Sequence, residues 1–325
     1  MAEDIDASKG VRQDDIIVAF MGPTGSGKSY FIDLLTKQIG KRSRTTLKSV
    51  TQNVEATRMP SDDGPSGRYF VFVDTPGFDE KDRTDMQILT LINEWLKTTY
   101  KRDVKLSGLI YLHPITHNRM AGIPYRNLRM FGELCGDVAM SQVVLVTTMW
   151  ERLGLYEGQE GEEGQKVGER RVQELRNKFW KELIEKGSEV DALKKATTDD
   201  AWRVVNKLVE RRNELDRVAV LLQQEVVDKK IALKETQAGQ ALYTDYQKRL
   251  AAQKERMKKV LEQVDKSKDP GLKKELQKEY DRIRKEFDKT FAESETLKRS
   301  LLDRFLSLFK GKPKAKGVKI SAEGL

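Results

Sequence analysis

The sequence contains very few of the residues that form disulfides and metal sites. Cys135 is the only cysteine among the 325 residues, and His113 and His117 are the only histidines. A single cysteine cannot form an intramolecular disulfide, which favours a reducing compartment and a packed thiol at Cys135. Three such side chains are also too few for a typical zinc site, so we expect no zinc.

Long apolar segments are missing as well. No run of about 18 apolar residues occurs, so the sequence predicts no membrane-spanning helix. The N-terminal segment MAEDIDASKG is polar and acidic, unlike a secretory signal peptide. We therefore expect a cytoplasmic protein.

Charged residues make up 34% of the chain, and hydrophobic residues only 38%. This composition is lean for one compact fold and indicates that part of the chain is elongated helix. The net charge is +9, but the 60 basic and 51 acidic residues are interleaved, as on solvated helix faces. No zinc-finger spacing or aromatic-basic signature occurs, so we expect no nucleic-acid partner.

The first half of the chain alternates short apolar runs with amphipathic segments. The runs are residues 16–21, 69–73, 106–112 and 143–146, and the segments are residues 30–39, 84–98, 125–135 and 165–186. Strands that alternate with helices at this spacing indicate βαβ units and a buried, mostly parallel sheet. We predict an α/β domain at residues 12–212, after a flexible N-terminus at residues 1–11.

From about residue 213 the pattern becomes helical. Glycine is scarce, charge dominates, and apolar residues recur every three or four positions. The turn sequence SKDPG separates two such stretches. We predict two long helices at residues 213–309 that fold back as an antiparallel coiled-coil hairpin. One broken helix, or a coil between two chains, is the alternative.

A phosphate-binding loop is predicted near the N-terminus. The stretch IIVAFMGPTGSGKS matches the pattern G-x-x-x-x-G-K-[ST], between an apolar strand and an amphipathic helix. Backbone N–H groups of such a loop face phosphate oxygens, the lysine reaches the β and γ phosphates, and the serine hydroxyl binds Mg²⁺. The predicted nucleotide contacts are Gly22, Pro23, Thr24, Gly25, Ser26, Gly27, Lys28, Ser29 and Tyr30.

A second element follows the next apolar run, in the stretch YFVFVDTPGF. Asp74 ends the predicted strand, so it should lie beside the loop and hold Mg²⁺, while the N–H group of Gly77 can bond a γ-phosphate. We therefore predict Mg²⁺ as cofactor and a nucleoside triphosphate as ligand.

D-x-P-G after a strand is the switch element of P-loop GTPases. With it, the chain resembles the septin-like branch of these proteins, in particular the immune-associated nucleotide-binding (GIMAP, or avirulence-induced) GTPases and related chloroplast-import GTPases. That family carries a switch threonine in a K-S-x-T context, matched by Lys48-Ser49-Val50-Thr51. The resemblance covers residues 12–210 and implies that GTP and GDP are the ligands and that Thr51 contacts Mg²⁺ and γ-phosphate.

Two departures concern hydrolysis. Phe78 stands where Ras-like enzymes have a glutamine that orients water, so we expect slow hydrolysis. The resembling family also lacks this glutamine and pairs its nucleotide domains face to face, which implies a homodimer. Arg119 matches an arginine that faces the partner's phosphates in the chloroplast-import relatives and is the catalytic candidate. The alternative is that Arg119 and the two histidines only hold a loop.

A third departure concerns the base. The family ends this strand with T-K-x-D or T-R-x-D, whose aspartate accepts the N1 and N2 protons of guanine. Here Thr147, Thr148, Met149 and Trp150 occupy these places. Thr148 and Trp150 are the base-side candidates, since an indole ring can stack on a purine. Glu151, one residue later, replaces the aspartate if the loop is shifted.

The C-terminal tail combines apolar and basic residues. Leucines and phenylalanines between residues 301 and 309 can share one helical face, and residues 310–325 form a basic flexible tail. This pattern fits a peripheral anionic-membrane contact. The alternative is the end of the hairpin followed by a solvated tail.

Together these features predict a GTP-binding switch with a helical extension that contacts protein partners. Two alternatives remain. One is a P-loop ATPase or phosphotransferase, and the other is a coiled-coil interaction protein with an inert nucleotide domain.

Overall fold

The computed structural model describes residues 1–42, 53–61, 68–78, 83–117, 120, 122–153, 162–214 and 219–310. They belong to two compact units, Met1–Asp245 and Tyr246–Leu325. No helix within these ranges is both long and apolar enough to cross a membrane.

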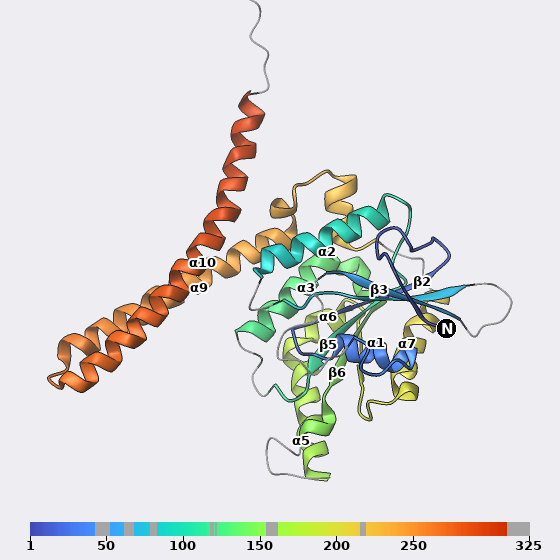
Figure 1. Cartoon of the computed structure of the whole chain (residues 1–325), viewed down its shortest axis with the longest axis horizontal. Helices are drawn as coiled ribbons and strands as arrows, with labels where there is room; N and C mark the ends of the chain where they lie inside the picture. Colours follow the sequence, from blue (N-terminus) through green and yellow to red (C-terminus); the bar gives the residue numbers. More distant parts are fainter. Residues whose placement is uncertain are drawn as a thin grey trace, which may run out of the picture. The chain divides into compact units, whose positions relative to one another are not determined.

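The first unit is built on a seven-stranded sheet (Figure 1). The strand order is β1-β3-β4-β2-β5-β6-β7. Strands β4, β2, β5, β6 and β7 pair in parallel, whereas β3 pairs antiparallel with both β4 and β1. The mostly parallel sheet is confirmed. The strands are β1 (Glu3–Ile5), β2 (Ile16–Met21), β3 (Glu55–Pro60), β4 (Tyr69–Asp74), β5 (Gly108–Pro114), β6 (Val143–Thr148) and β7 (Glu189–Ala192).

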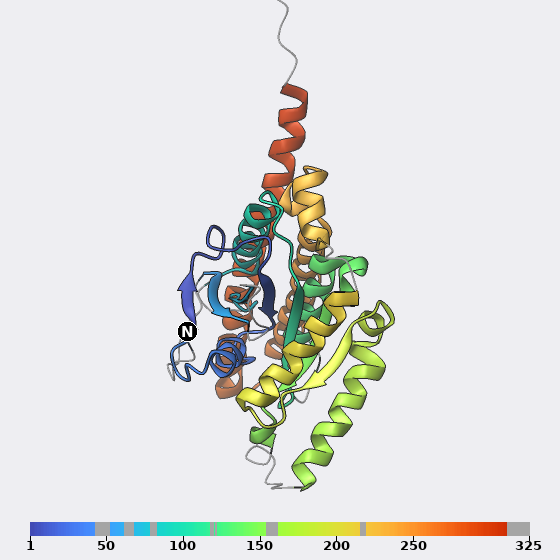
Figure 2. The same cartoon turned by 90° about the vertical axis from the view of Figure 1, so that its right-hand side faces the viewer.

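Helices cover both faces of the sheet, as the two views in Figures 1 and 2 show. Helices α1 (Lys28–Thr36) and α7 (Thr198–Glu214) pack on one face, where Phe20, Phe72 and Val204 belong to one buried cluster. Helices α2 (Asp85–Tyr100), α3 (Ile123–Ala139) and α8 (Leu221–Gln223) pack together on the other. Burial of both faces explains the continuous apolar strands.

Two glycines allow close helix packing. A Cβ at Gly108 would lie 2.3 Å from Leu208 Cδ2, so α7 can approach β5 only over a glycine. Gly136 interrupts α3 with φ 72° and ψ 166°, and a Cβ there would lie 2.5 Å from Leu221 Cβ. The nearby Cys135 is buried, and burial raises the pKa of its thiol well above the usual range.

Two predicted helices differ from the structure. Residues 165–186 form α5 (Glu162–Glu174), a π-helical turn at Leu175–Phe179 and α6 (Lys181–Glu185) rather than one helix. The predicted helix from residue 213 is also wrong: α9 (Gln237–Lys266) begins much later. Val220 and Leu222 are fully buried in the first unit, and residues 221–235 form only short helical turns before α9 begins.

The second unit is a helical hairpin. Helix α9 ends at Lys266 and α10 (Pro270–Lys310) begins at the proline of the predicted turn. Gly271 N–H donates to Asp269 Oδ1 at 2.8 Å and closes this turn. Val260 and Ile283 are buried, and two polar pairs lie between the helices: Gln253 Nε2 donates to Thr290 Oγ1 at 3.4 Å, and Gln247 Nε2 donates to Ser294 Oγ at 2.9 Å.

Candidate nucleotide site

The predicted phosphate loop connects β2 to α1. Gly22 adopts φ 143°, and a Cβ there would lie 2.4 Å from the Leu112 carbonyl oxygen. Gly25 and Gly27 adopt φ 77° and 92°, a region that favours glycine. The three glycines therefore let the backbone turn between the strand and the helix, so that N–H groups can face an anion.

Lys28 is held over this loop. Its Nζ donates to the carbonyl oxygens of Gly22 and Pro23, both at 3.2 Å, and the side chain is buried. The ammonium group therefore lies over the loop, where it can donate to phosphate oxygens. Charged phosphate oxygens are stronger acceptors than carbonyl oxygens.

Ser29 and Asp74 come together at the end of β4. Ser29 Oγ donates to Asp74 Oδ2 at 2.6 Å, and Asp74 is buried. A hydroxyl and a carboxylate are hard oxygen ligands, which fit Mg²⁺. No cluster of three or more His, Cys, Asp or Glu exists among the described residues. This small donor set suits Mg²⁺, which keeps waters and binds substrate phosphates.

Glu55 is a neighbour that the sequence did not indicate. It lies directly opposite Asp74 in the β3–β4 ladder. Desolvation, together with the carboxylates of Asp74 and Asp4, raises the pKa of Glu55. The pairing joins distant parts of the chain, so no local signal could have placed Glu55 beside the predicted Mg²⁺ ligand.

Gly77 touches the phosphate loop. A Cβ there would lie 2.5 Å from the Thr24 backbone nitrogen, so any side chain would displace one of the two segments. Thr24 Oγ1 donates to the Gly77 carbonyl at 3.4 Å, and Phe78 forms a parallel bridge with Pro23. The segment after β4 is thus in direct contact with the loop.

Thr51 and Arg119 lie outside the described residues and stay predictions. Tyr30, on the first turn of α1, is exposed.

The end of β6 also contacts the phosphate loop. Thr148 Oγ1 donates to the Ser26 carbonyl at 2.8 Å, whereas Thr147 Oγ1 accepts from Trp150 Nε1 at 3.0 Å. Thr148, rather than Thr147, is therefore the strand-end threonine that meets the loop.

Trp150 is enclosed by protein. Lys194 Nζ lies 4.9 Å from its ring centroid, and a Cβ at Gly168 would lie 2.5 Å from the ring. Only 8% of the residue is exposed, so little ring surface is available to stack on a base. This packing weighs against the predicted stacking role. The side chain of Glu151, the next residue, is 53% exposed.

His113 is buried near the carboxyl end of β5, 6.1 Å from Trp180 and 5.6 Å from His117 between ring centroids. Burial, with a smaller effect from His117, lowers the pKa of His113 to about 3. An unfolded histidine titrates near ~6.5.

We expect unfolding to become easier as the pH falls below about 6.5, because the unfolded chain then binds a proton that the folded chain does not. The free energy of unfolding should fall by about 1.4 kcal/mol per pH unit. Urea denaturation between about pH 7 and 5.5, where carboxyl groups stay mostly ionised, measures this slope. His113→Phe should remove most of this slope, and His117→Gln should remove a smaller part, because burial also lowers the pKa of His117. An unchanged slope in His113→Phe would contradict the assignment.

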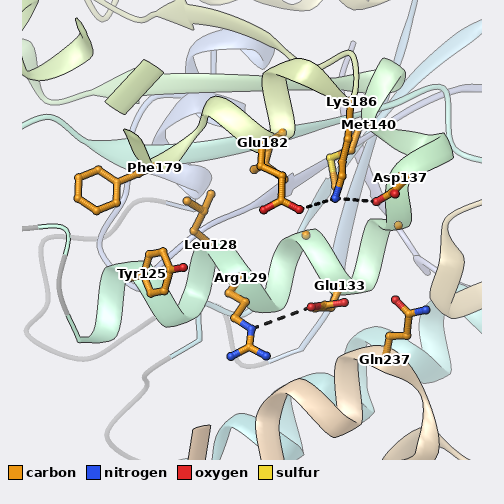
Figure 3. Close-up of a pocket in the computed structure, with 13 residues that line it drawn as sticks. Tyr125, Leu128, Arg129, Glu133, Asp137, Met140, Phe179, Glu182, Lys186 and Gln237 are labelled. Carbon is orange, nitrogen blue, oxygen red and sulfur yellow. Dashed lines mark hydrogen bonds and ion pairs between the residues drawn. The ribbon is translucent and has the colours of Figure 1, made fainter. Parts of the chain in front are cut away.

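A separate small cavity, of about 120 Å³, lies between α3 and residues 179–186 (Figure 3). Lys186 Nζ contacts Glu182 Oε1 at 2.6 Å and Asp137 Oδ1 at 2.9 Å. No phosphate-loop residue is among the described residues that line it, so it is distinct from the nucleotide site.

One protein-family model matches part of the chain. Residues 17–118 match the family described as 50S ribosome-binding GTPase. No curated protein matches the chain.

Similar solved structures share little sequence identity with the chain. Toc33 from Arabidopsis thaliana, in complex with Mg²⁺ and GMPPNP, is 16% identical with a TM-score of 0.47, and the match covers 64% of this chain and 88% of Toc33. Era from Aquifex aeolicus, bound to GDP and aluminium fluoride, is 16% identical with a TM-score of 0.41, covering 61% of this chain and 56% of Era.

Proposed function

We propose that this P-loop GTPase domain is a switch that binds GTP with Mg²⁺ and hydrolyses it slowly. One observation carries the proposal: Lys28, Ser29 and Asp74 converge at one glycine-rich loop, with Ser29 Oγ 2.6 Å from Asp74 Oδ2. When bound, Mg²⁺ would neutralise phosphate charge. Ser29 and Asp74 would hold it, and Lys28 would orient the β and γ phosphates.

The segment after β4 supplies the switch. The Gly77 N–H would bond the γ-phosphate, and Thr51 would close on the same group and on Mg²⁺. Gly77 already lies against Thr24 of the loop, so a phosphate bound in the loop acts directly on Gly77. Phe78 has no polar side-chain atom to orient the attacking water, which supports slow hydrolysis.

Guanine is the proposed base. An ionised carboxylate has two oxygens that only accept hydrogen bonds. It can therefore accept from two N–H groups of guanine at once. Thr148 anchors the strand end to the loop at Ser26, which makes Glu151 the third residue beyond the anchor. We assign the base-reading carboxylate to the exposed Glu151 and a packing role to Trp150.

Calorimetric titration with GMPPNP and with the matching adenine analogue, in Mg²⁺, tests the proposal. Tight binding of the guanine analogue alone supports it. Equal binding of both would favour a P-loop ATPase or a general nucleotide switch. Binding of neither would contradict a nucleotide function and leave an interaction protein with an inert domain.

We also propose that two copies pair through their nucleotide faces, with Arg119 of each neutralising transition-state charge in the other. Light scattering should show dimers with Mg²⁺ and GMPPNP, and turnover per molecule should rise with protein concentration. Arg119→Ala should lower turnover without lowering nucleotide affinity. A strictly monomeric protein under these conditions would contradict the pairing.

The hairpin is the proposed effector element, with coiled-coil packing and protein partners. We place the protein in the cytoplasm, with the basic tail at an anionic membrane surface as the peripheral contact. The interleaved charges of the chain support the absence of a nucleic-acid partner.

A further inference from the structure

We propose that Arg126 couples Phe78 and the start of α2 to helix α9, so that a rearrangement on nucleotide exchange is passed to α9. This coupling rests on the proposed nucleotide function, and it assigns a specific transmission residue on α3.

Arg126 binds two helices at once. Its Nη2 lies 3.2 Å from Asp85 Oδ2 on α2, and its Nη1 lies 3.4 Å from Asp245 Oδ2 on α9. The Arg126 side chain is only 10% exposed, so these ion pairs are screened less than surface pairs. A planar guanidinium holds two carboxylates in a fixed mutual geometry. Displacing Asp85 therefore changes the position at which Asp245 is best bound.

Phe78, which follows Gly77, is also held by α3. Asn127, the next residue, donates from Nδ2 to the Phe78 carbonyl at 3.5 Å. Phe78 is buried and bridges to Pro23 of the phosphate loop. Two adjacent residues of α3 thus contact Phe78 and Asp85. A bound group that moves Gly77 would act directly on Phe78, the next residue.

The start of α2 is a defined element. Thr84 Oγ1 accepts from Gln87 N–H at 3.2 Å, and Gln87 Oε1 accepts from Thr84 N–H at 2.9 Å. This reciprocal capping fixes the first turn, which carries Asp85. Asp85 consequently moves together with the first turn of α2.

Helix α9 is continuous from Gln237 to Lys266, and Asp245 is the last residue of the first unit. The helix begins at an independent anchor, because Gln237 N–H donates to the Glu225 carboxylate at 3.2 Å. Arg126 is thus a second attachment of α9, about two turns along. Loss of the Asp245 contact removes this attachment and leaves the anchor in place.

Hydrogen exchange with GDP and with GMPPNP, both in Mg²⁺, tests the coupling. In the unaltered protein, amides around residues 240–250 should exchange at different rates in the two nucleotides. In Asp245→Asn the ratio of the exchange rates in GDP and GMPPNP should approach one at these amides. The same ratio at the start of α2 should persist. Arg129→Gln is the control, because Arg129 lies on the same helix, is partly exposed and pairs with Glu133 of α3.

A second measurement uses thermodynamic reciprocity. If nucleotide state moves α9 through Asp245, then Asp245→Asn must change the ratio of GDP to GMPPNP affinities, by a factor of about 5 or more. Binding of neither nucleotide would overturn the proposed function. Binding with a response at α2 but none at α9 would overturn only the coupling. The coupling would also be overturned if, in Asp245→Asn, exchange of the α9 amides still differed between the two nucleotides. An unchanged ratio of GDP to GMPPNP affinities in this variant would overturn it too.

Discussion

Lys28→Ala should weaken binding of GMPPNP by a factor of about 10² to 10³. The ammonium group already donates to the Gly22 and Pro23 carbonyls, and it is the buried cation of the loop placed to meet β and γ phosphate oxygens. Hydrogen bonds to charged groups contribute about 1.5 to 3 kcal/mol each, and about 1.4 kcal/mol corresponds to a tenfold change in affinity. Calorimetric titration of the variant measures the loss.

Lys41→Ala is the matched control, since Lys41 forms a partly exposed pair with Asp4 and should leave affinity unchanged. Thermal unfolding of both variants checks that the fold is intact. A Lys28→Ala protein that is folded and binds GMPPNP as tightly as the unaltered protein would contradict the phosphate-site assignment.

Glu151→Gln should reduce the preference for the guanine over the adenine analogue by a factor of about 10², which corresponds to about 2.7 kcal/mol. An amide replaces one acceptor with a donor, which meets a guanine N–H unfavourably. The ratio of the two calorimetric affinities measures the preference.

Trp150→Phe separates the two candidates for base recognition. It keeps an aromatic ring in the enclosed position and removes the bond from Nε1 to Thr147 Oγ1, so stability should fall by about 1 kcal/mol while base preference stays. Loss of preference in Trp150→Phe, with none in Glu151→Gln, would restore the tryptophan as the base contact.

The phosphate site could be predicted from the sequence because its signal is local. Strand β2, the loop and α1 follow one another without a gap, and each glycine has a backbone conformation that glycine favours. Asp74 was predictable for a related reason, since it directly ends an apolar run and parallel strands bring their carboxyl ends to one edge.

Features set by distant contacts could not be predicted. Strand β3 carries Glu55 and Arg58 and lacks the apolar run of a buried strand, because its place depends on pairing with β4. Thr147 and Thr148 are chemically alike, and only the bond from Thr148 to Ser26 shows which of them meets the loop. Leu222 fits a helical stripe, yet its burial in the first unit decides the local structure.

The burial of Cys135 has a practical consequence for labelling. Its thiol is enclosed in the first unit, and its raised pKa keeps it protonated, whereas the thiolate is the form that attacks alkylating reagents. A cysteine introduced on the exposed faces of α9 or α10 can therefore carry a single fluorophore or spin label without removal of the natural thiol. Slow modification of Cys135 would in turn report opening of the α3 packing rather than events at the surface.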